Sequence, residues 1–251
     1  MLVGFIGDCH GDFGLLVDAV NKIQNDCLNL YGVLPSKIIQ LGDMGFYPEG
    51  TLPKLPNLKR DPSQKFYFIR GNHEDHDSLP LGASQPQDVA DEWPEWEFVP
   101  DGYYEDGILF IGGAWSIDQE FRKKKEEYYN SLGVKFIYKW YPSEEITKLK
   151  MGQIRAVTHK GLKVIVSHDG PNCLYEQLCN PAFGPPRRTR TADFLDKVLL
   201  EKAPERIIFG HHHKREDFNI QHPATKNIKG HCIDMLRNRH SLDTATFILR
   251  L

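Results

Sequence analysis

Residues 2–11 read Leu-Val-Gly-Phe-Ile-Gly-Asp-Cys-His-Gly, a short apolar run followed at once by a polar turn. A continuous apolar run of this length predicts a strand buried on both faces, as in a sheet covered by helices. Asp8 and His10, in the turn, are both residue types that bind metal ions. Residues two apart on an extended chain point to the same side, so these two side chains can share one site.

The same pattern recurs along the chain. Five more apolar runs predict buried strands, at residues 37–40, 65–69, 108–111, 162–166 and 206–209. The first two strands are joined by residues 14–30, in which apolar side chains recur at helical spacing. Strands alternating with helices predict an α/β fold.

Further elements are predicted with weaker patterns. Helices are expected over residues 119–129 and 191–201, and another after Ser143, where Glu144 and Glu145 would occupy a first turn. Residues 78–106, rich in proline and tryptophan, are expected to form a long packed loop. Short strands are expected within residues 229–235 and 244–249.

Composition bounds the class of protein. The chain has 251 residues, enough for a large core, and its hydrophobic and charged fractions of 40 % and 26 % are those of a globular protein. A net charge of −3 disfavours an extended nucleic-acid surface. No apolar run is long enough for a membrane helix, and the N-terminus lacks a basic leader. Five cysteines without a CxxC pair predict reduced thiols and a cytoplasmic protein. We find no linker, so residues 1–251 are expected to form a single domain.

Five short polar blocks follow predicted strands. They are Gly7-Asp8-Cys9-His10-Gly11, Gly42-Asp43-Met44-Gly45, Gly71-Asn72-His73-Glu74, Ser167-His168-Asp169-Gly170-Pro171 and Gly210-His211-His212-His213. Taken alone, each block is better explained as a surface turn, a helix cap or a strand exit than as a metal site. Because ligands bind at the carboxyl ends of strands in α/β sheets, five such blocks together favour one common site.

The residue types in these blocks suit metal binding. Two carboxylates, one amide and four imidazoles form a set without thiolates, which favours Mn²⁺, Fe or Zn²⁺ over Mg²⁺ or Ca²⁺. Seven ligands are too many for one ion and are typical of two. The spacing lets His211 and His213 face one site, whereas Cys9 and His212 would face elsewhere.

The order of these blocks resembles that of the calcineurin-like metallophosphoesterase superfamily, over residues 1 to about 215. Residues 69–74, Ile-Arg-Gly-Asn-His-Glu, are also similar to the signature of serine/threonine phosphoprotein phosphatases. Residues 112–118, Gly-Gly-Ala-Trp-Ser-Ile-Asp, and 140–145, Trp-Tyr-Pro-Ser-Glu-Glu, resemble the small bacterial and phage members. The resemblance implies a four-layer fold, a β-sandwich flanked by helices.

The resemblance also implies roles for individual residues. The first of two divalent metal ions, most readily Mn²⁺, would be bound by Asp8, His10, Asp43 and His213. The second would be bound by Asp43, Asn72, His168 and His211, with Asp43 bridging the two. His73 would be the catalytic acid and would bind no metal.

Two positions depart from the phosphoprotein phosphatase pattern. Those enzymes carry an Asp and an Arg after the Gly-Asp block, and the Asp orients the catalytic histidine. Here the positions hold Phe46 and Tyr47. The partner of His73 is therefore unassigned, with Glu74 and Asp75 adjacent in sequence, and a phosphoprotein substrate is put in doubt.

The predicted function is a binuclear metal-dependent phosphoesterase. A metal-bridging hydroxide would attack phosphorus, and His73 would protonate the leaving oxygen. Charge on the phosphate needs a cationic clamp, for which Arg122 is the first candidate and Arg70 the second. The alternative for Arg122 is the solvated face of a charged helix. Residues 185–190 would be an exposed loop or a rim facing the substrate.

Two other functions remain open. The same metal centre would serve a phosphodiesterase or nuclease acting on nucleotides. From another class, a member of this fold can be a non-catalytic protein-binding scaffold, although His73 and every metal position are present. The substrate within the phosphate esters, the native metals, the pathway and the oligomeric state do not follow from the sequence.

Overall fold

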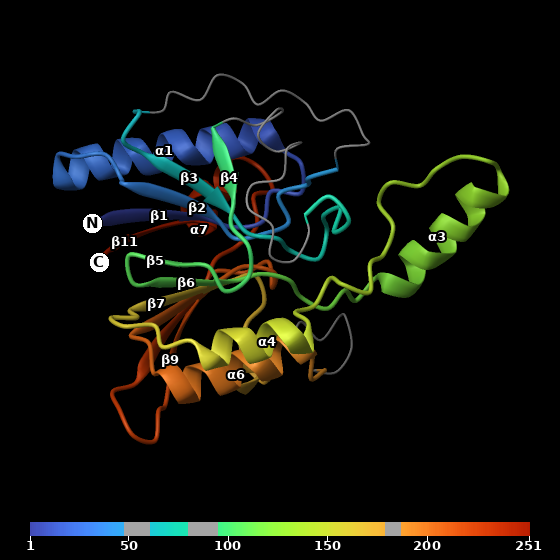
Figure 1. Cartoon of the computed structure of the whole chain (residues 1–251). Coiled ribbons are helices and arrows are strands. Elements are labelled where there is room, and N and C mark those ends of the chain that lie inside the picture. The colour runs from blue at the N-terminus through green and yellow to red at the C-terminus, as the bar shows by residue number, and fades with distance from the viewer. Residues whose placement is uncertain (48–60, 80–94, 179–186) are drawn as a thin grey trace.

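A computed structural model describes residues 1–47, 61–79, 95–178 and 187–251. Two mixed sheets lie face to face in it (Figure 1). The first sheet has the strand order β11-β1-β2-β3-β4, in which β1 to β4 are parallel and β11 is antiparallel to β1. Its strands are β1 (Leu2–Ile6), β2 (Lys37–Gln40), β3 (Lys65–Phe68), β4 (Trp96–Phe98) and β11 (Thr246–Arg250).

The second sheet has the order β5-β6-β7-β8-β10-β9. Its central strands β6, β7, β8 and β10 are parallel, and the edge strands β5 and β9 are antiparallel to their neighbours. Its strands are β5 (Tyr104–Glu105), β6 (Ile108–Ile111), β7 (Val164–Ser167), β8 (Arg206–Phe209), β9 (Glu216–Ile220) and β10 (Ile228–Cys232).

Helices cover the outer face of each sheet. Helix α1 (Phe13–Tyr31) and the short α7 (Leu242–Ala245) lie on the first sheet, and α4 (Lys148–Ala156), α5 (Tyr175–Leu178) and α6 (Arg190–Lys202) lie on the second (Figure 1). Single 3-10 turns span Asn172–Leu174 and Arg239–Ser241. The predicted α/β fold, with two sheets flanked by helices in four layers, is confirmed.

Local sequence explains where α1 begins and ends. The Asp12 side chain accepts a hydrogen bond from the backbone N–H of Leu15 (3.0 Å), which satisfies one free donor of the first turn. The helix ends at Gly32 in the left-handed conformation, which glycine adopts without steric cost. The helix therefore starts directly after the Asp8–His10 turn.

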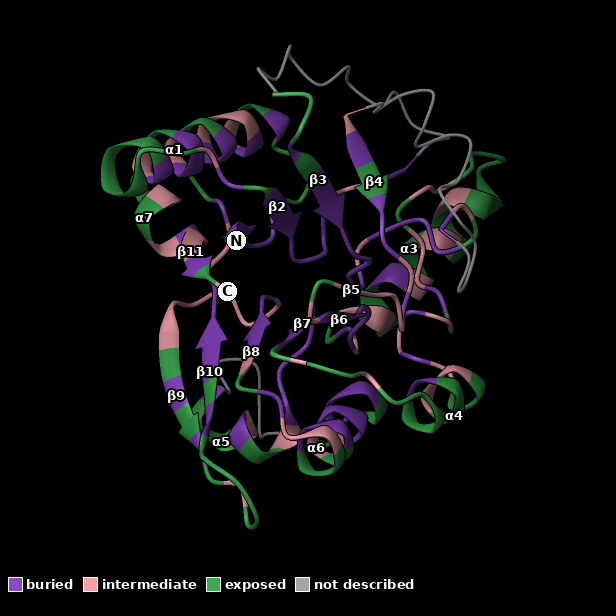
Figure 2. Cartoon of the chain, turned by 60° about the vertical axis from the view of Figure 1, so that its left-hand side comes forward, coloured by how far each residue is buried: buried purple, intermediate pink, exposed green. Residues whose placement is uncertain are grey.

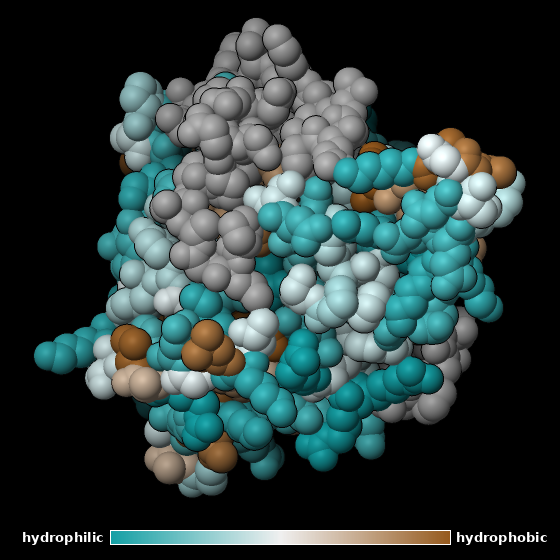
Figure 3. All heavy atoms as spheres, turned by 45° about the vertical axis from the view of Figure 1, so that its right-hand side comes forward, coloured by the Kyte–Doolittle hydropathy of each residue, from teal (hydrophilic) through white to brown (hydrophobic). Residues whose placement is uncertain are grey.

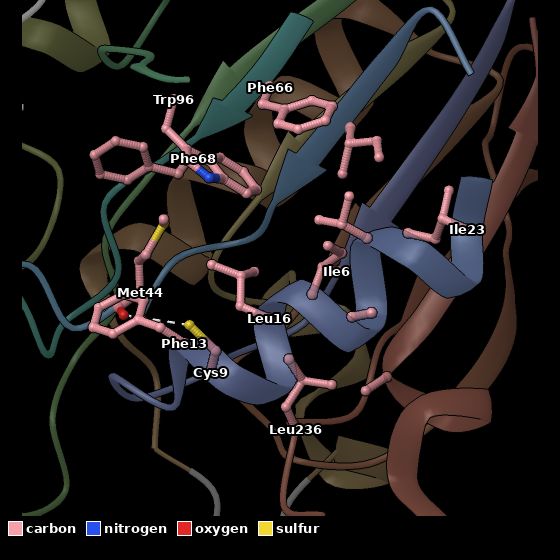
Figure 4. Close-up of a cluster of buried hydrophobic side chains, with 14 of the residues drawn as sticks. Ile6, Cys9, Phe13, Leu16, Ile23, Met44, Phe66, Phe68, Trp96 and Leu236 are labelled. Atoms are coloured by element: carbon pink, nitrogen blue, oxygen red, sulfur yellow. Dashed lines mark hydrogen bonds between the residues drawn. The ribbon is translucent and has the colours of Figure 1, made fainter. Parts of the chain in front are cut away.

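The core has three parts, and the strands β1, β2, β6 and β7 are buried on both faces (Figure 2). One cluster fills the space between α1 and the first sheet, where Phe66, Phe68 and Trp96 lie over Leu16 (Figure 4). A second cluster joins the two sheets, and a third lies between the second sheet and its helices. Both sheets are thus held rigidly, as a site at their ends requires.

Two sequence expectations are wrong, and one strand has no counterpart among the expectations. Glu144 and Glu145 do not form the first turn of a helix; α4 starts only at Lys148, because the Glu144 side chain is buried in a polar network. The loop expected over residues 78–106 contains β4 and β5, and its residues 80–94 lie outside the described part. Strand β9 was not predicted at all.

Helix α3 (Gln119–Ser131) projects from the body, away from the sheets (Figure 1). We call α3 and the residues on either side of it, 117–138, the projecting arm. Several of its large apolar side chains are exposed: Ile117, Phe121, Tyr128, Leu132, Val134 and Tyr138. The face in Figure 3 is mainly hydrophilic, and its apolar atoms form separate groups.

Among the described residues, no helix has the length and apolar character needed to cross a membrane. The described cysteines, Cys9, Cys27, Cys173 and Cys232, are free thiols.

Glu105 joins the two sheets at the edge opposite α3. It accepts hydrogen bonds from the buried Lys37, from Lys65 (2.7 Å) and from Tyr67 (2.9 Å). Partial burial acts to raise the pKa of Glu105, but these three donors outweigh it and lower the pKa to about 2. Because this value lies below the ordinary one, the stabilisation is complete above about pH 4.5 and is lost as the pH falls through about 2.

We therefore expect Glu105→Gln to lower the free energy of unfolding at pH 7 by about 1 kcal/mol. The difference from wild type should shrink between pH 4.5 and pH 2. Urea unfolding across this range measures it, with Glu127→Gln on the exposed face of α3 as the control. A difference that stays constant with pH would show that the network does not act through the charge of Glu105.

Candidate metal centre

The predicted ligands all lie at the carboxyl ends of strands. Asp8 and His10 follow β1, Asp43 follows β2, Asn72 follows β3, His168 follows β7, and His211 and His213 follow β8. Since both sheets present these ends to the same side, the two sets of turns meet. Six of these residues form two clusters of three, and within each cluster the potential ligand atoms all lie within 4.8 Å of one another.

Several of the predicted ligands have a backbone conformation that is unfavourable for residues with a side chain. Among the described residues, six that are not glycine have a positive φ, and four of them are His10, Asp43, His211 and His213, with φ between 45° and 63°. Residues with side chains adopt this region at an energetic cost that the surrounding structure must offset. Such strain clusters at functional sites, and here it falls on the predicted ligands.

The first cluster contains Asp8, His10 and His213. His213 Nε2 lies 3.2 Å from Asp8 Oδ2 and 3.2 Å from His10 Nε2. Ligand atoms bound about 2.1 Å from one tetrahedral ion are separated by roughly 3 to 3.5 Å. The spacing of this cluster therefore fits a single ion.

The second cluster contains Asp43, His168 and His211. His168 Nδ1 donates to the carbonyl oxygen of Leu41 (2.7 Å), which leaves Nε2 free for the site. That Nε2 lies 3.0 Å from Asn72 Oδ1 and 3.5 Å from Asp43 Oδ1. The amide oxygen of Asn72 thus joins the second cluster.

Asp43 faces both clusters with different oxygens. Its Oδ1 lies 3.5 Å from His168 Nε2, on the side of the second cluster. Its Oδ2 lies 3.8 Å from His10 Nε2, on the side of the first. The carboxylate is 1 % exposed, so water offers it little compensation for its charge. The carboxylate of Asp43 therefore lies between the two clusters.

A comparison with protein families agrees with this geometry. The model of the calcineurin-like phosphoesterase family matches residues 1–215, which include all of the strand-end turns. The chain belongs to this family. A search of curated proteins found no match for it. Members of the family are metal-dependent phosphoesterases, and the two clusters are the places where this calcineurin-like phosphoesterase could hold its metals.

Electrostatics favour cations at both clusters of this phosphoesterase. Burial opposes the charge of Asp8 and Asp43, but nearby imidazoles, His168 above all, outweigh it and lower the pKa of both carboxylates. In turn, burial would lower the pKa of His168, yet Asp43 and Asp8 raise it to about 10. Burial and the neighbouring His168 lower the pKa of His211 to about 3, so this ring is neutral. The donor set therefore fits metal ions, which would replace the proton on His168.

Close backbone approach requires glycine beside Asp43. A Cβ atom on Gly71 would lie 2.1 Å from Asp43 Oδ1, and one on Gly42 would lie 2.5 Å from His168 Nδ1. Glu74 holds the same turns together, since it accepts hydrogen bonds from the backbone N–H groups of Met44 and Gly71. Burial and the nearby Asp43 raise the pKa of Glu74 to about 8.

A polar network orients the Asn72 amide. Asn72 Nδ2 donates to Ser116 Oγ (2.8 Å), and Ser116 Oγ donates to Glu144 Oε2 (2.6 Å). Arg122 donates to Ser116, to Glu144 (3.1 Å) and to the carbonyl oxygen of Asn72 (3.2 Å). Since the amide nitrogen faces Ser116, its oxygen must face His168. Sequence reasoning missed Ser116 and Glu144, because no local pattern links them to Asn72.

The two arginines predicted to bind phosphate are both buried. Arg122 is 4 % exposed and is neither solvated nor turned outward; its donors face the network around Asn72. Arg70 pairs with Asp101 (2.8 Å) and donates to the carbonyl oxygens of Ser143 and Glu144. In this structure both side chains hold loops together, and their role in phosphate binding stays a prediction.

His73 lies at the accessible edge of the site. Its backbone N–H donates to Asp43 Oδ1 (2.7 Å), and its ring centre lies 5.4 Å from that of His10. The ring itself is about one third exposed. Burial and Arg122 lower the pKa of His73, although Asp43 acts in the opposite direction.

The residues expected to face away from the site do so. Cys9 Sγ donates to the carbonyl oxygen of Met44 (3.3 Å) and packs into the core below α1 (Figure 4). His212 Nε2 lies 3.4 Å from Asp169 Oδ1, and its ring contacts Tyr175 and Phe209. The alternation along each turn therefore separates site-facing from core-facing side chains.

Proposed function

We propose that this protein hydrolyses phosphate esters with two divalent metal ions, one at each cluster. The observation that supports the proposal best is the placement of Asp43, whose two oxygens face different clusters. That placement supports a role for Asp43 as bridging ligand, with Asp8, His10 and His213 on one side and Asn72, His168 and His211 on the other. The absence of thiolates favours Mn²⁺, with Fe and Zn²⁺ as alternatives.

The protein side chains have separate tasks in such a reaction. When bound, two ions would polarise the phosphate and lower the pKa of a water molecule. Asp8 and Asp43 supply the buried negative charge that holds them. His73, next to this charge but partly exposed, can reach the oxygen of the departing alcohol and give it a proton.

Small phosphate esters are the substrate class that we propose. Phosphoprotein phosphatases carry a polar pair after the Gly-Asp block, and here Phe46 and Tyr47 occupy these positions. Phe46 is fully buried and packs against Phe68 in the core, with ring centres 6.3 Å apart. It therefore offers no polar group to a phosphopeptide.

A turnover panel with Mn²⁺ tests this proposal. We expect hydrolysis of small monoesters to exceed that of phosphopeptides by at least tenfold in kcat/KM, with aryl diesters and dinucleotides in the same panel. Higher turnover of diesters or dinucleotides would identify a phosphodiesterase. Phosphopeptide turnover far above all others would contradict the proposed substrate class, and no turnover with both metals bound would favour a protein-binding scaffold.

A further inference from the structure

Asp118 occupies an unusual position at the start of the projecting arm. It occupies the N-cap position, immediately before the first residue of α3, where an aspartate normally accepts a hydrogen bond from its own helix. Its side chain makes no such bond. The carboxylate is instead directed at His73 and Arg122, with Oδ1 lying 4.0 Å from His73 Nε2 and 3.2 Å from Arg122 Nε.

The other acidic residues near His73 are engaged elsewhere. Glu74 accepts from the backbone of Met44 and Gly71, and Asp75 accepts from Tyr141 Oη (2.6 Å) and from Ser78. Among the described carboxylates, Asp118 is the one that comes within 4.0 Å of a ring nitrogen of His73. Glu74 and Asp75, the two residues that follow His73 in the sequence, are thus not its partners.

Arg122 forms an ion pair with this carboxylate. The arginine is buried and is held by Glu144 and by the backbone of Asn72, so it cannot follow a mobile side chain. Its Nε lies against the same Asp118 oxygen that faces His73. Through this ion pair Asp118 is linked to the loop that carries His73, although it comes from a different part of the chain.

We propose that Asp118 is the positioning residue of His73, and that it replaces the aspartate missing at Phe46. A carboxylate beside Nε2 favours the ring orientation in which the Nε2 proton points toward it and stabilises the charged, doubly protonated ring, so that Nδ1 also carries a proton to give to the leaving oxygen. The separation of 4.0 Å is longer than a hydrogen bond, as is common for catalytic contacts before substrate binds. This inference rests on the proposed role of His73 as proton donor.

The test compares Asp118→Asn with wild type on two esters. We expect kcat on an alkyl phosphate to fall by at least about tenfold, with a smaller loss on a nitrophenyl phosphate, whose leaving group needs no proton. KM and the number of bound metals should stay unchanged. In a His73→Ala background, the same substitution should have little further effect, because the two residues act as a unit. Glu120→Gln, an exposed neighbour in the first turn of α3, is the matched control.

A second measurement does not depend on turnover. The ring-nitrogen NMR signals of His73, assigned by comparison with His73→Ala, should shift in Asp118→Asn and not in Glu120→Gln. Unchanged signals, or an equal loss of kcat with and without His73, would overturn the inference while leaving the phosphoesterase proposal intact. Loss of one metal in Asp118→Asn would also overturn it, since Asp118 would then act by holding Arg122 and Asn72.

Discussion

Asp43→Asn should abolish hydrolysis and lower the metal content of the protein. The substitution keeps the size of the side chain but removes the negative charge shared between the clusters, and one neutral amide cannot balance two dications. Each ion contributes several kcal/mol to a phosphoryl-transfer transition state, so we expect turnover to fall by more than about 10³-fold. Turnover of a nitrophenyl ester and elemental analysis after dialysis measure the two effects.

The control for this prediction is Asp243→Asn. Asp243 is a strongly exposed residue of α7 that pairs with Lys22 and lies outside both clusters. It should keep full turnover and metal content. Two metals per chain together with full turnover in Asp43→Asn would contradict the two-metal account.

His73→Ala should have the second-largest effect, and its size should depend on the leaving group. General acid catalysis typically contributes about 10²–10⁴-fold. An alkoxide is a poor leaving group without a proton, whereas a nitrophenolate departs readily as an anion. We therefore expect most of this factor to be lost on alkyl phosphates and clearly less on nitrophenyl phosphates, as measured by kcat for both.

Metal content distinguishes a proton donor from a ligand in this variant. His73 lies outside both clusters of ligand atoms, so His73→Ala should bind as much metal as wild type. An equal loss on both kinds of ester would show that His73 orients the phosphate instead of donating a proton.

Much of the fold is predictable because its signals are local. The apolar runs at β1, β2, β6 and β8 match the observed strands, since a strand buried on both faces needs a continuous apolar run. β9 carries the polar sequence Glu-Asp-Phe-Asn-Ile and lies at a sheet edge, so it lacks that run. The acidic pair after Ser143 suggested a helix start, but burial of Glu144 beside Ser116 and Arg122 prevailed over this local preference.

The site also has parts that the sequence predicts and parts that it does not. Ligand-type residues at strand ends are visible in the sequence, because the spacing along one turn decides which side chains share a face. The contacts that orient these residues join distant parts of the chain. Asp118 is 45 positions from His73 (118 − 73), and Ser116 is 44 from Asn72. No periodicity connects such pairs, so only the folded chain shows them.

A metal titration of the metal-free protein tests the central claim most directly. Mn²⁺ is added stepwise, and bound metal per chain and turnover of a small phosphate monoester are measured on the same samples. We predict that binding saturates at two ions per chain and that turnover appears as the second site fills. Full turnover with one ion or none, or two bound ions without hydrolysis of any phosphate ester, would contradict the account.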